Sequence, residues 1–303
     1  MKALIRAFAL LSWLLIVCSS ATAVAALSVV TTTTDLAAVA ASIGKERVRV
    51  RALALHTQDP HWVDARPNLA LELSNADLLL AVGAELEIGW LPTLQLGARN
   101  GRIQKGARGY LECAELVELL ERPTGKVDRS MGDIHPSGNP HYMMDPRAVE
   151  RVAVGIARRL AELDPPGRQR YLENAKAFVG ELRQARTRWE QKLRKARGAR
   201  VIAFHRSLAY LADWIGLDVV DHIESKPGVP PNPRHIAELI ERAKSLRVRV
   251  VLQETFHPAN TSELVVKKIG ARLLVIPAAP NFSAGQGYVA FMDGIVNQLA
   301  GAL

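Results

Sequence analysis

Apolar residues form two kinds of pattern, which alternate along the chain. Short β-branched or leucine-rich runs predict buried strands, because parallel strands covered on both faces appear as continuous apolar segments. Between them, apolar residues recur every three to four positions, as in amphipathic helices. The clearest strand-like runs are 27–34, 48–55, 76–82, 200–204, 217–222, 248–252 and 272–276. This alternation predicts an α/β fold, with mainly parallel sheets covered by helices.

One long helical pattern lies between the two sets of strands. Apolar residues recur at helical spacing through 168–197, where Gly180 is the only glycine and no proline occurs. A helix of this length would span about 45 Å, which suits either a coiled coil or an element that crosses between two lobes. A single isolated run favours the second interpretation. We therefore expect an N-terminal lobe over 26–166, a linking helix over 167–198 and a C-terminal lobe over 199–303.

The first 25 residues differ from the rest. A basic start precedes the apolar run 7–17, and an Ala-Val-Ala cleavage signal ends at Ala25. This pattern predicts a secretory signal peptide, because the run is too short to span a membrane. Cys18 raises the alternative of a lipid anchor, but Val17 before it is larger than a lipobox normally has. We therefore expect cleavage after Ala25 and a soluble periplasmic protein.

Composition restricts the kinds of site and partner. A chain of 303 residues with 49% hydrophobic and 23% charged residues is typical of a soluble globular protein with two lobes. Cys113 is the only cysteine after the leader, which excludes an internal disulfide and a cysteine-rich zinc cluster. The formal net charge is +9, but the arginines are scattered along amphipathic helices, so we expect no nucleic-acid partner.

Three histidines stand just after a strand or just before a helix. They are His61, His141 and His205, and in open α/β sheets this edge is where ligands bind. His141 lies in a stiff loop between two prolines, directly before a helix for which Asp145 is the predicted N-cap and Pro146 the first residue. Taken singly, each histidine could be a surface, packing or core residue. Two come from the first lobe and one from the second, so a cleft between the lobes could bring them together.

Glu254 follows its strand in the same way. It could be a helix cap or an arginine partner, or it could add an oxygen to the three imidazoles. Three nitrogen ligands and one carboxylate form a set typical of tetrahedral zinc. The candidate metal ligands are therefore His61, His141, His205 and Glu254.

The chain also resembles a known family. The residues that carry the resemblance are Asp59-Pro60-His61, Asn139-Pro140-His141, Asp145-Pro146, Phe204-His205 and the segment 208–216. Their order and spacing resemble those of the metal-binding solute-binding proteins of bacterial ABC importers for zinc and manganese, the ZnuA/TroA-like group. The resemblance implies two lobes joined by one rigid helix and a single divalent metal between them. It also implies delivery through the periplasm to a membrane permease.

By this resemblance, His61, His141 and His205 take the three histidine positions. Many members have an aspartate after the last strand of the second lobe, whereas here no carboxylate follows that strand until Asp293. We therefore expect Glu254 as the fourth ligand, with water as the alternative. The first-lobe loop that is long and histidine-rich in many zinc members is short here, so we do not expect it to gather metal. His135 is its only histidine before the His141 motif.

Ligand chemistry favours zinc, because manganese prefers more oxygen ligands and a higher coordination number. We expect a monomeric metal carrier rather than an enzyme. One alternative is an exported zinc hydrolase in which Glu254 is the general base and water the fourth ligand. However, the chain has no His-Glu-x-x-His or Gly-x-Ser-x-Gly motif. A metal-binding surface adhesin is a further alternative.

Overall fold

The computed structural model describes residues 26–125, 127, 132 and 134–303. The predicted signal peptide, with Cys18 and the cleavage point after Ala25, lies outside this range. Within the described part of the chain, no helix has the length and apolar character needed to cross a membrane.

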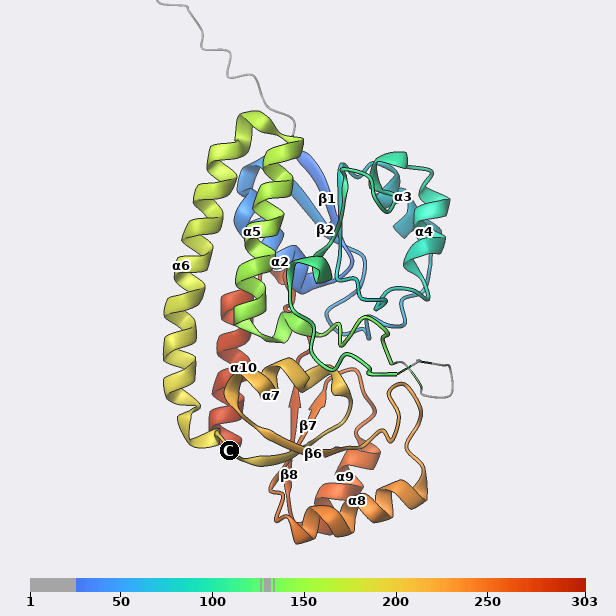
Figure 1. The fold of residues 1–303 in the computed structure, drawn as a ribbon, viewed down its shortest axis with the longest axis vertical. Coiled ribbons are helices and arrows are strands. Elements are labelled where there is room, and N and C mark those ends of the chain that lie inside the picture. The colour runs from blue at the N-terminus through green and yellow to red at the C-terminus, as the bar shows by residue number, and fades with distance from the viewer. Residues whose placement is uncertain (1–25, 126, 128–131, 133) are drawn as a thin grey trace, which may run out of the picture.

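The N-terminal lobe is built on a four-stranded parallel sheet with strand order β2-β1-β3-β4 (Figure 1). Its strands are β1 (Leu27–Thr31), β2 (Val48–Ala52), β3 (Leu78–Ala81) and β4 (Tyr110–Glu112). Its helices are α2 (Thr34–Gly44), α3 (Pro67–Ser74), α4 (Leu91–Ala98) and α5 (Pro146–Leu163). Helices α2 and α5 share a buried core with one face of the sheet, while α3 and α4 pack on the other face. Both faces are thus covered, as the apolar strand sequences require.

The C-terminal lobe repeats this design with strand order β6-β5-β7-β8. Its strands are β5 (Arg200–Ala203), β6 (Asp218–His222), β7 (Val250–Glu254) and β8 (Arg272–Ile276). Its helices are α7 (Ala209–Ile215), α8 (Pro233–Ser245), α9 (Asn260–Ile269) and α10 (Tyr288–Ala302). In both lobes the strand order reverses at the first strand, and in parallel sheets ligands bind outside the carboxyl ends of the strands at such a point.

Helix α6 (Arg168–Lys192) runs alongside both lobes (Figure 1). It packs on α5 and α2 in the first lobe and on α10 in the second. Its buried side chains belong to one hydrophobic core that includes residues of both lobes. The structure therefore confirms two helix-covered parallel sheets connected by a long helix. The exact division into lobes at 166 and 198 stays a prediction.

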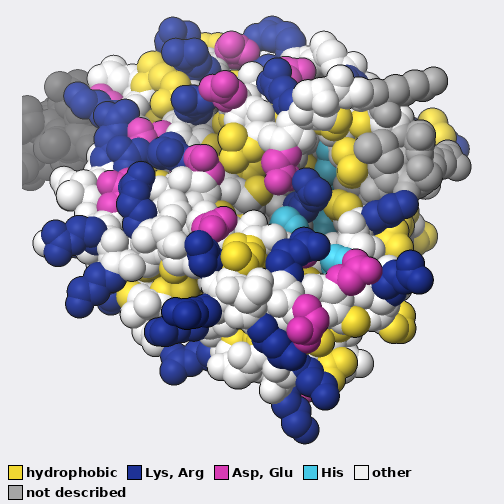
Figure 2. All heavy atoms as spheres, turned by 60° about the horizontal axis from the view of Figure 1, so that its bottom comes forward, with side chains coloured by type: hydrophobic (Ala, Val, Ile, Leu, Met, Phe, Trp, Pro, Cys, Tyr) yellow, Lys and Arg dark blue, Asp and Glu magenta, His cyan; other side chains and the backbone are white. Residues whose placement is uncertain are grey.

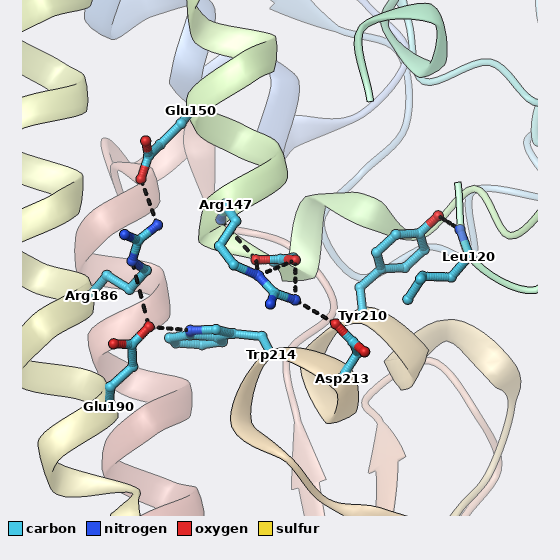
Figure 3. Close-up of polar contacts among 9 residues, drawn as sticks. Leu120, Arg147, Glu150, Arg186, Glu190, Tyr210, Asp213 and Trp214 are labelled. Atoms are coloured by element: carbon cyan, nitrogen blue, oxygen red, sulfur yellow. Dashed lines mark hydrogen bonds and ion pairs between the residues drawn. The ribbon is translucent and has the colours of Figure 1, made fainter. Parts of the chain in front are cut away.

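Polar contacts also join the two lobes beside α6 (Figure 3). Arg147 on α5 forms an ion pair with Asp213 on α7 at 2.5 Å. The indole nitrogen of Trp214 on α7 donates to Glu190 on α6 at 2.9 Å. The Tyr210 hydroxyl accepts a hydrogen bond from a backbone nitrogen of the first lobe at 2.8 Å. These contacts tie α7 of the second lobe to the first lobe and to α6.

Strand β7 begins two residues later than its apolar run predicts. Arg247 has a left-handed backbone, with φ of 54°, so the turn after α8 extends to Val248. The strand then pairs with β5 from Val250 and with β8 up to Glu254. Glu254 is consequently the last residue of the strand rather than part of the following loop.

Candidate metal centre

The structure brings His61, His141 and His205 together between the lobes. One ring nitrogen from each lies within 4.8 Å of those of the other two. The centroid of the His61 ring lies 5.1 Å from that of His141 and 5.4 Å from that of His205. The rings of His141 and His205 are 5.5 Å apart and perpendicular to each other. This clustering is the arrangement that three ligands of one metal ion require.

His61 is held in place by the loop after β2. The Asp59 carboxylate accepts from the His61 backbone nitrogen at 2.9 Å and lies 2.7 Å from its ring Nδ1. The carbonyl of Pro60 accepts from the Trp90 indole at 2.9 Å, which ties the loop to α4. Burial opposes ionisation of Asp59, but its hydrogen bond and charge interaction with His61 lower the pKa of this carboxyl. A carboxylate on Nδ1 leaves Nε2 directed at the metal position, as in many metal sites.

His141 is positioned by contacts from both lobes. Its backbone nitrogen donates to the Asn139 side chain at 2.9 Å, and that side chain donates in turn to the carbonyl of Arg206 at 2.9 Å. The Tyr210 hydroxyl donates to the carbonyl of Asn139 at 2.6 Å. As predicted, Asp145 caps the following helix through the backbone nitrogen of its second residue. The loop therefore presents the imidazole from a rigid base.

His205 stands directly after β5 and is 7% exposed. Its Nδ1 lies 2.8 Å from the carboxylate of Glu224, which also accepts from the backbone nitrogen of Gly228 at 3.0 Å. Burial disfavours the charged imidazole, but the hydrogen bond and charge of Glu224 raise the pKa of His205. Two of the three histidines, one in each lobe, thus have a carboxylate on Nδ1.

Unpaired nitrogens distinguish this cluster from a packed histidine core. The Nε2 atoms of His61 and His141 are buried and have no hydrogen-bond partner among the described residues. Buried polar atoms are normally paired, so each such atom needs an explanation. Burial, together with the neighbouring His61 and His205, lowers the pKa of His141 well below its ordinary value, so this imidazole is neutral at pH 7. A neutral imidazole with a free lone pair is the form that binds a metal.

Glu254, predicted as the fourth ligand, is 1% exposed and lies outside the group of three. One carboxylate oxygen accepts a hydrogen bond from the Ser207 hydroxyl. The other has no hydrogen-bond partner and lies 3.7 Å from Nε2 of His257. Burial raises the pKa of this carboxyl. The role of Glu254 as a ligand stays a prediction.

Sequence reasoning missed the supporting residues. Asp59 lies in a motif that was noted, but its contact with the ring of His61 was not foreseen. Glu224 follows β6 as Glu254 ends β7, so its position at a strand end was the available signal. His257 stacks on Phe204 with ring centroids 4.1 Å apart, and nothing in the local sequence indicates this contact.

One face of the molecule shows how the charged side chains are distributed. Figure 2 shows lysine and arginine side chains spread over one face and interspersed with acidic ones, with histidine atoms visible among them. The absence of a nucleic-acid partner stays a prediction.

Comparisons with known proteins support a metal-binding role. The sequence model described as "Zinc-uptake complex component A periplasmic" matches residues 29–302. The high-affinity zinc uptake system protein ZnuA of Bacillus subtilis is 22% identical over 284 residues, which cover 91% of this chain and 88% of the relative.

Solved structures share the fold. A crystal structure of ZnuA superimposes with a TM-score of 0.77 at 26% identity, covering 91% of this chain and 99% of the other. The substrate-binding protein FpvC of Pseudomonas aeruginosa in complex with Mn²⁺ superimposes with a TM-score of 0.76 at 23% identity, covering 91% and 98%. The second likeness is evidence for the fold alone.

Proposed function

The chain belongs to the family of periplasmic zinc-uptake complex components, and from this premise we propose that it captures one zinc ion between its lobes and delivers it to an ABC permease. The observation that carries the proposal is the group of three imidazole nitrogens within 4.8 Å of one another. The first lobe supplies two of these nitrogens and the second lobe supplies one. A metal ion would therefore hold the two lobes together.

Capture depends on preorganisation. The rings of His61 and His205 are already oriented through Asp59 and Glu224, so little side-chain entropy is lost when the metal binds. The desolvation cost of the unpaired Nε2 atoms is present before binding, and coordination removes it. Release requires the ligand of one lobe to move away from those of the other. His205 is the one ligand of the three that lies on the second lobe. The site would therefore open when His205 moves away from the two ligands on the first lobe.

The donor set supports zinc over manganese. Imidazole nitrogens suit zinc, whereas manganese prefers carboxylate, carbonyl and water oxygens. Three imidazoles, two of which have a carboxylate on Nδ1, form a nitrogen-rich centre. For the fourth place, Glu254 was predicted, with water as the alternative.

The partner and location follow from the family. Members of the family are extracytoplasmic metal-binding components of ABC importers. We propose a monomer, exported by the leader 1–25, that passes zinc to a membrane permease. The hydrolase alternative assigns Glu254 as a general base, but this carboxylate is buried against Ser207 and His257. Neither that alternative nor the adhesin alternative has an observation in its favour.

A metal titration tests the proposal. Protein stripped of metal should bind one equivalent of zinc, and His141→Ala should reduce the affinity by more than 100-fold. His235→Ala is the control, because its ring bonds the backbone carbonyl of His222 and is not one of the three clustered rings. Wild-type protein that bound no zinc, or His141→Ala with unchanged affinity, would refute the proposed function.

A further inference from the structure

A fourth histidine stands beside the cluster, on the loop that precedes the His141 motif. The centroid of the His135 ring lies 5.5 Å from that of His61, as close as the rings within the cluster lie to one another. His135 also lines one pocket together with His141 and His205. The ring therefore lies beside the three histidines of the cluster.

The state of the His135 ring matches that of the other ligands. The ring donates a hydrogen bond to the backbone carbonyl of Ala84, while its Nε2 is buried without a partner among the described residues. The donor is therefore Nδ1, and Nε2 carries the free lone pair. Fixing a tautomer through Nδ1 is how proteins prepare a histidine to bind a metal through Nε2.

The segment that anchors His135 has an unusual backbone. Gly83, Ala84 and Glu85 all have positive φ, at 83°, 49° and 68°. Two of the three are not glycine, and such residues are uncommon in this region. Glu87 holds the turn by accepting from the backbone nitrogens of Val82 and Gly83 at 2.8 and 3.0 Å. The buried turn thus presents a fixed carbonyl to the loop histidine.

We propose that His135 is the fourth metal ligand, so that zinc is held by four imidazole nitrogens. This inference rests on the proposed function, because it completes the same site. His135 lies outside the group whose atoms are within 4.8 Å of one another, so its ring must move toward the other three when the metal binds. To act as a ligand instead, Glu254 would also have to move, because it lies outside the same group. His135 keeps its hydrogen bond to Ala84 if its ring turns about that bond.

The proposal gives the short loop a defined role. Instead of gathering metal with many histidines, the loop would close the site with one. Four nitrogens leave no coordination position for water, as expected of a site that holds metal without catalysis. A site without oxygen ligands would also disfavour manganese.

X-ray absorption at the zinc edge tests this assignment, because multiple scattering from imidazole rings reports how many histidines bind. Zinc-loaded wild-type protein should show four imidazoles. His135→Ala should show three imidazoles and one oxygen, with zinc affinity more than 100-fold weaker, beyond the 10–100-fold typical of a supporting residue. His235→Ala should match wild type in both measurements. The wild-type spectrum tests the assignment whether or not His135→Ala folds.

Three imidazoles in wild type, with the spectrum of His135→Ala unchanged, would overturn the assignment. If Glu254→Gln then altered the spectrum, the fourth ligand would be that carboxylate, and otherwise it would be water. In both cases the loss of affinity in His141→Ala would show that the proposed function stands. A wild-type protein that bound no zinc would instead overturn both proposals.

Discussion

The contact between Asp59 and His61 allows the most detailed prediction. The carboxylate accepts from both the backbone nitrogen and, at 2.7 Å, the ring Nδ1 of His61. Asp59→Asn keeps an oxygen that can accept one of these hydrogen bonds but removes the negative charge. Asp59→Ala removes both the charge and the acceptor. The two variants therefore separate the contribution of the charge from that of ring orientation.

Loss of a carboxylate partner of a metal-bound histidine typically costs about 10–100-fold in affinity. We expect Asp59→Asn to weaken the free energy of zinc binding by about 1.4 kcal/mol, near the lower end of this range. Asp59→Ala should weaken it by about 2.7 kcal/mol, near the upper end. The folded-state pKa of Asp59 lies below its ordinary value, so its contribution is lost only as pH falls through that lowered pKa. The carboxylate stays ionised across pH 6–8, and the effect should be constant there.

The assay is a competition titration with a chromophoric zinc chelator at pH 7. Asp64→Asn is the control, because Asp64 lies in the same loop with a side chain that is 73% exposed and pairs with Arg66. Its zinc affinity should equal that of wild type. If Asp59→Ala bound zinc within twofold of wild type, the claim that Asp59 orients a metal ligand would be wrong.

Three further predictions follow from the same geometry. Zinc affinity should fall as pH drops from about 8 to about 6, because the raised pKa of His205 admits a competing proton; an affinity that did not change with pH in chelator titrations would contradict this. Tyr210→Phe should lower the free energy of unfolding by about 1–3 kcal/mol in urea titrations, because it leaves the partly buried Leu120 nitrogen and the buried Asn139 carbonyl unpaired; an unchanged midpoint and slope would contradict it. Free zinc at 100 times its Kd should stabilise the protein by about 2.7 kcal/mol, with a chelator reversing the rise in Tm, and a Tm indifferent to zinc would exclude binding to the native state.

Local sequence patterns predicted the architecture well. Apolar runs and capping residues are local signals, so the strands of both sheets and the N-cap at Asp145 could be placed. The convergence of His61, His141 and His205 also followed from a general rule about the carboxyl edges of parallel sheets. The first residue of β7 was harder to predict, because it depends on the left-handed turn at Arg247 and on pairing with the neighbouring strands.

The supporting side chains could not be predicted in the same way. Whether Glu224 or Glu254 reaches His205 depends on how the loops after β6 and β7 turn, and neither loop has a distinctive pattern. His135 was noted only as a single histidine in a polar loop. Its place beside His61 depends on the Ala84 carbonyl, which is distant in sequence and is presented by an irregular backbone. These contacts are properties of the folded chain.

The central claim is that one metal ion binds between the lobes on His61, His141 and His205. Anomalous diffraction from crystals of the zinc-loaded protein, measured on both sides of the zinc edge, tests this claim most directly. The account predicts a single strong peak among the three Nε2 atoms, bonded at about 2.0–2.1 Å to each. A peak elsewhere on the molecule, or none between the lobes at full zinc loading, would contradict it.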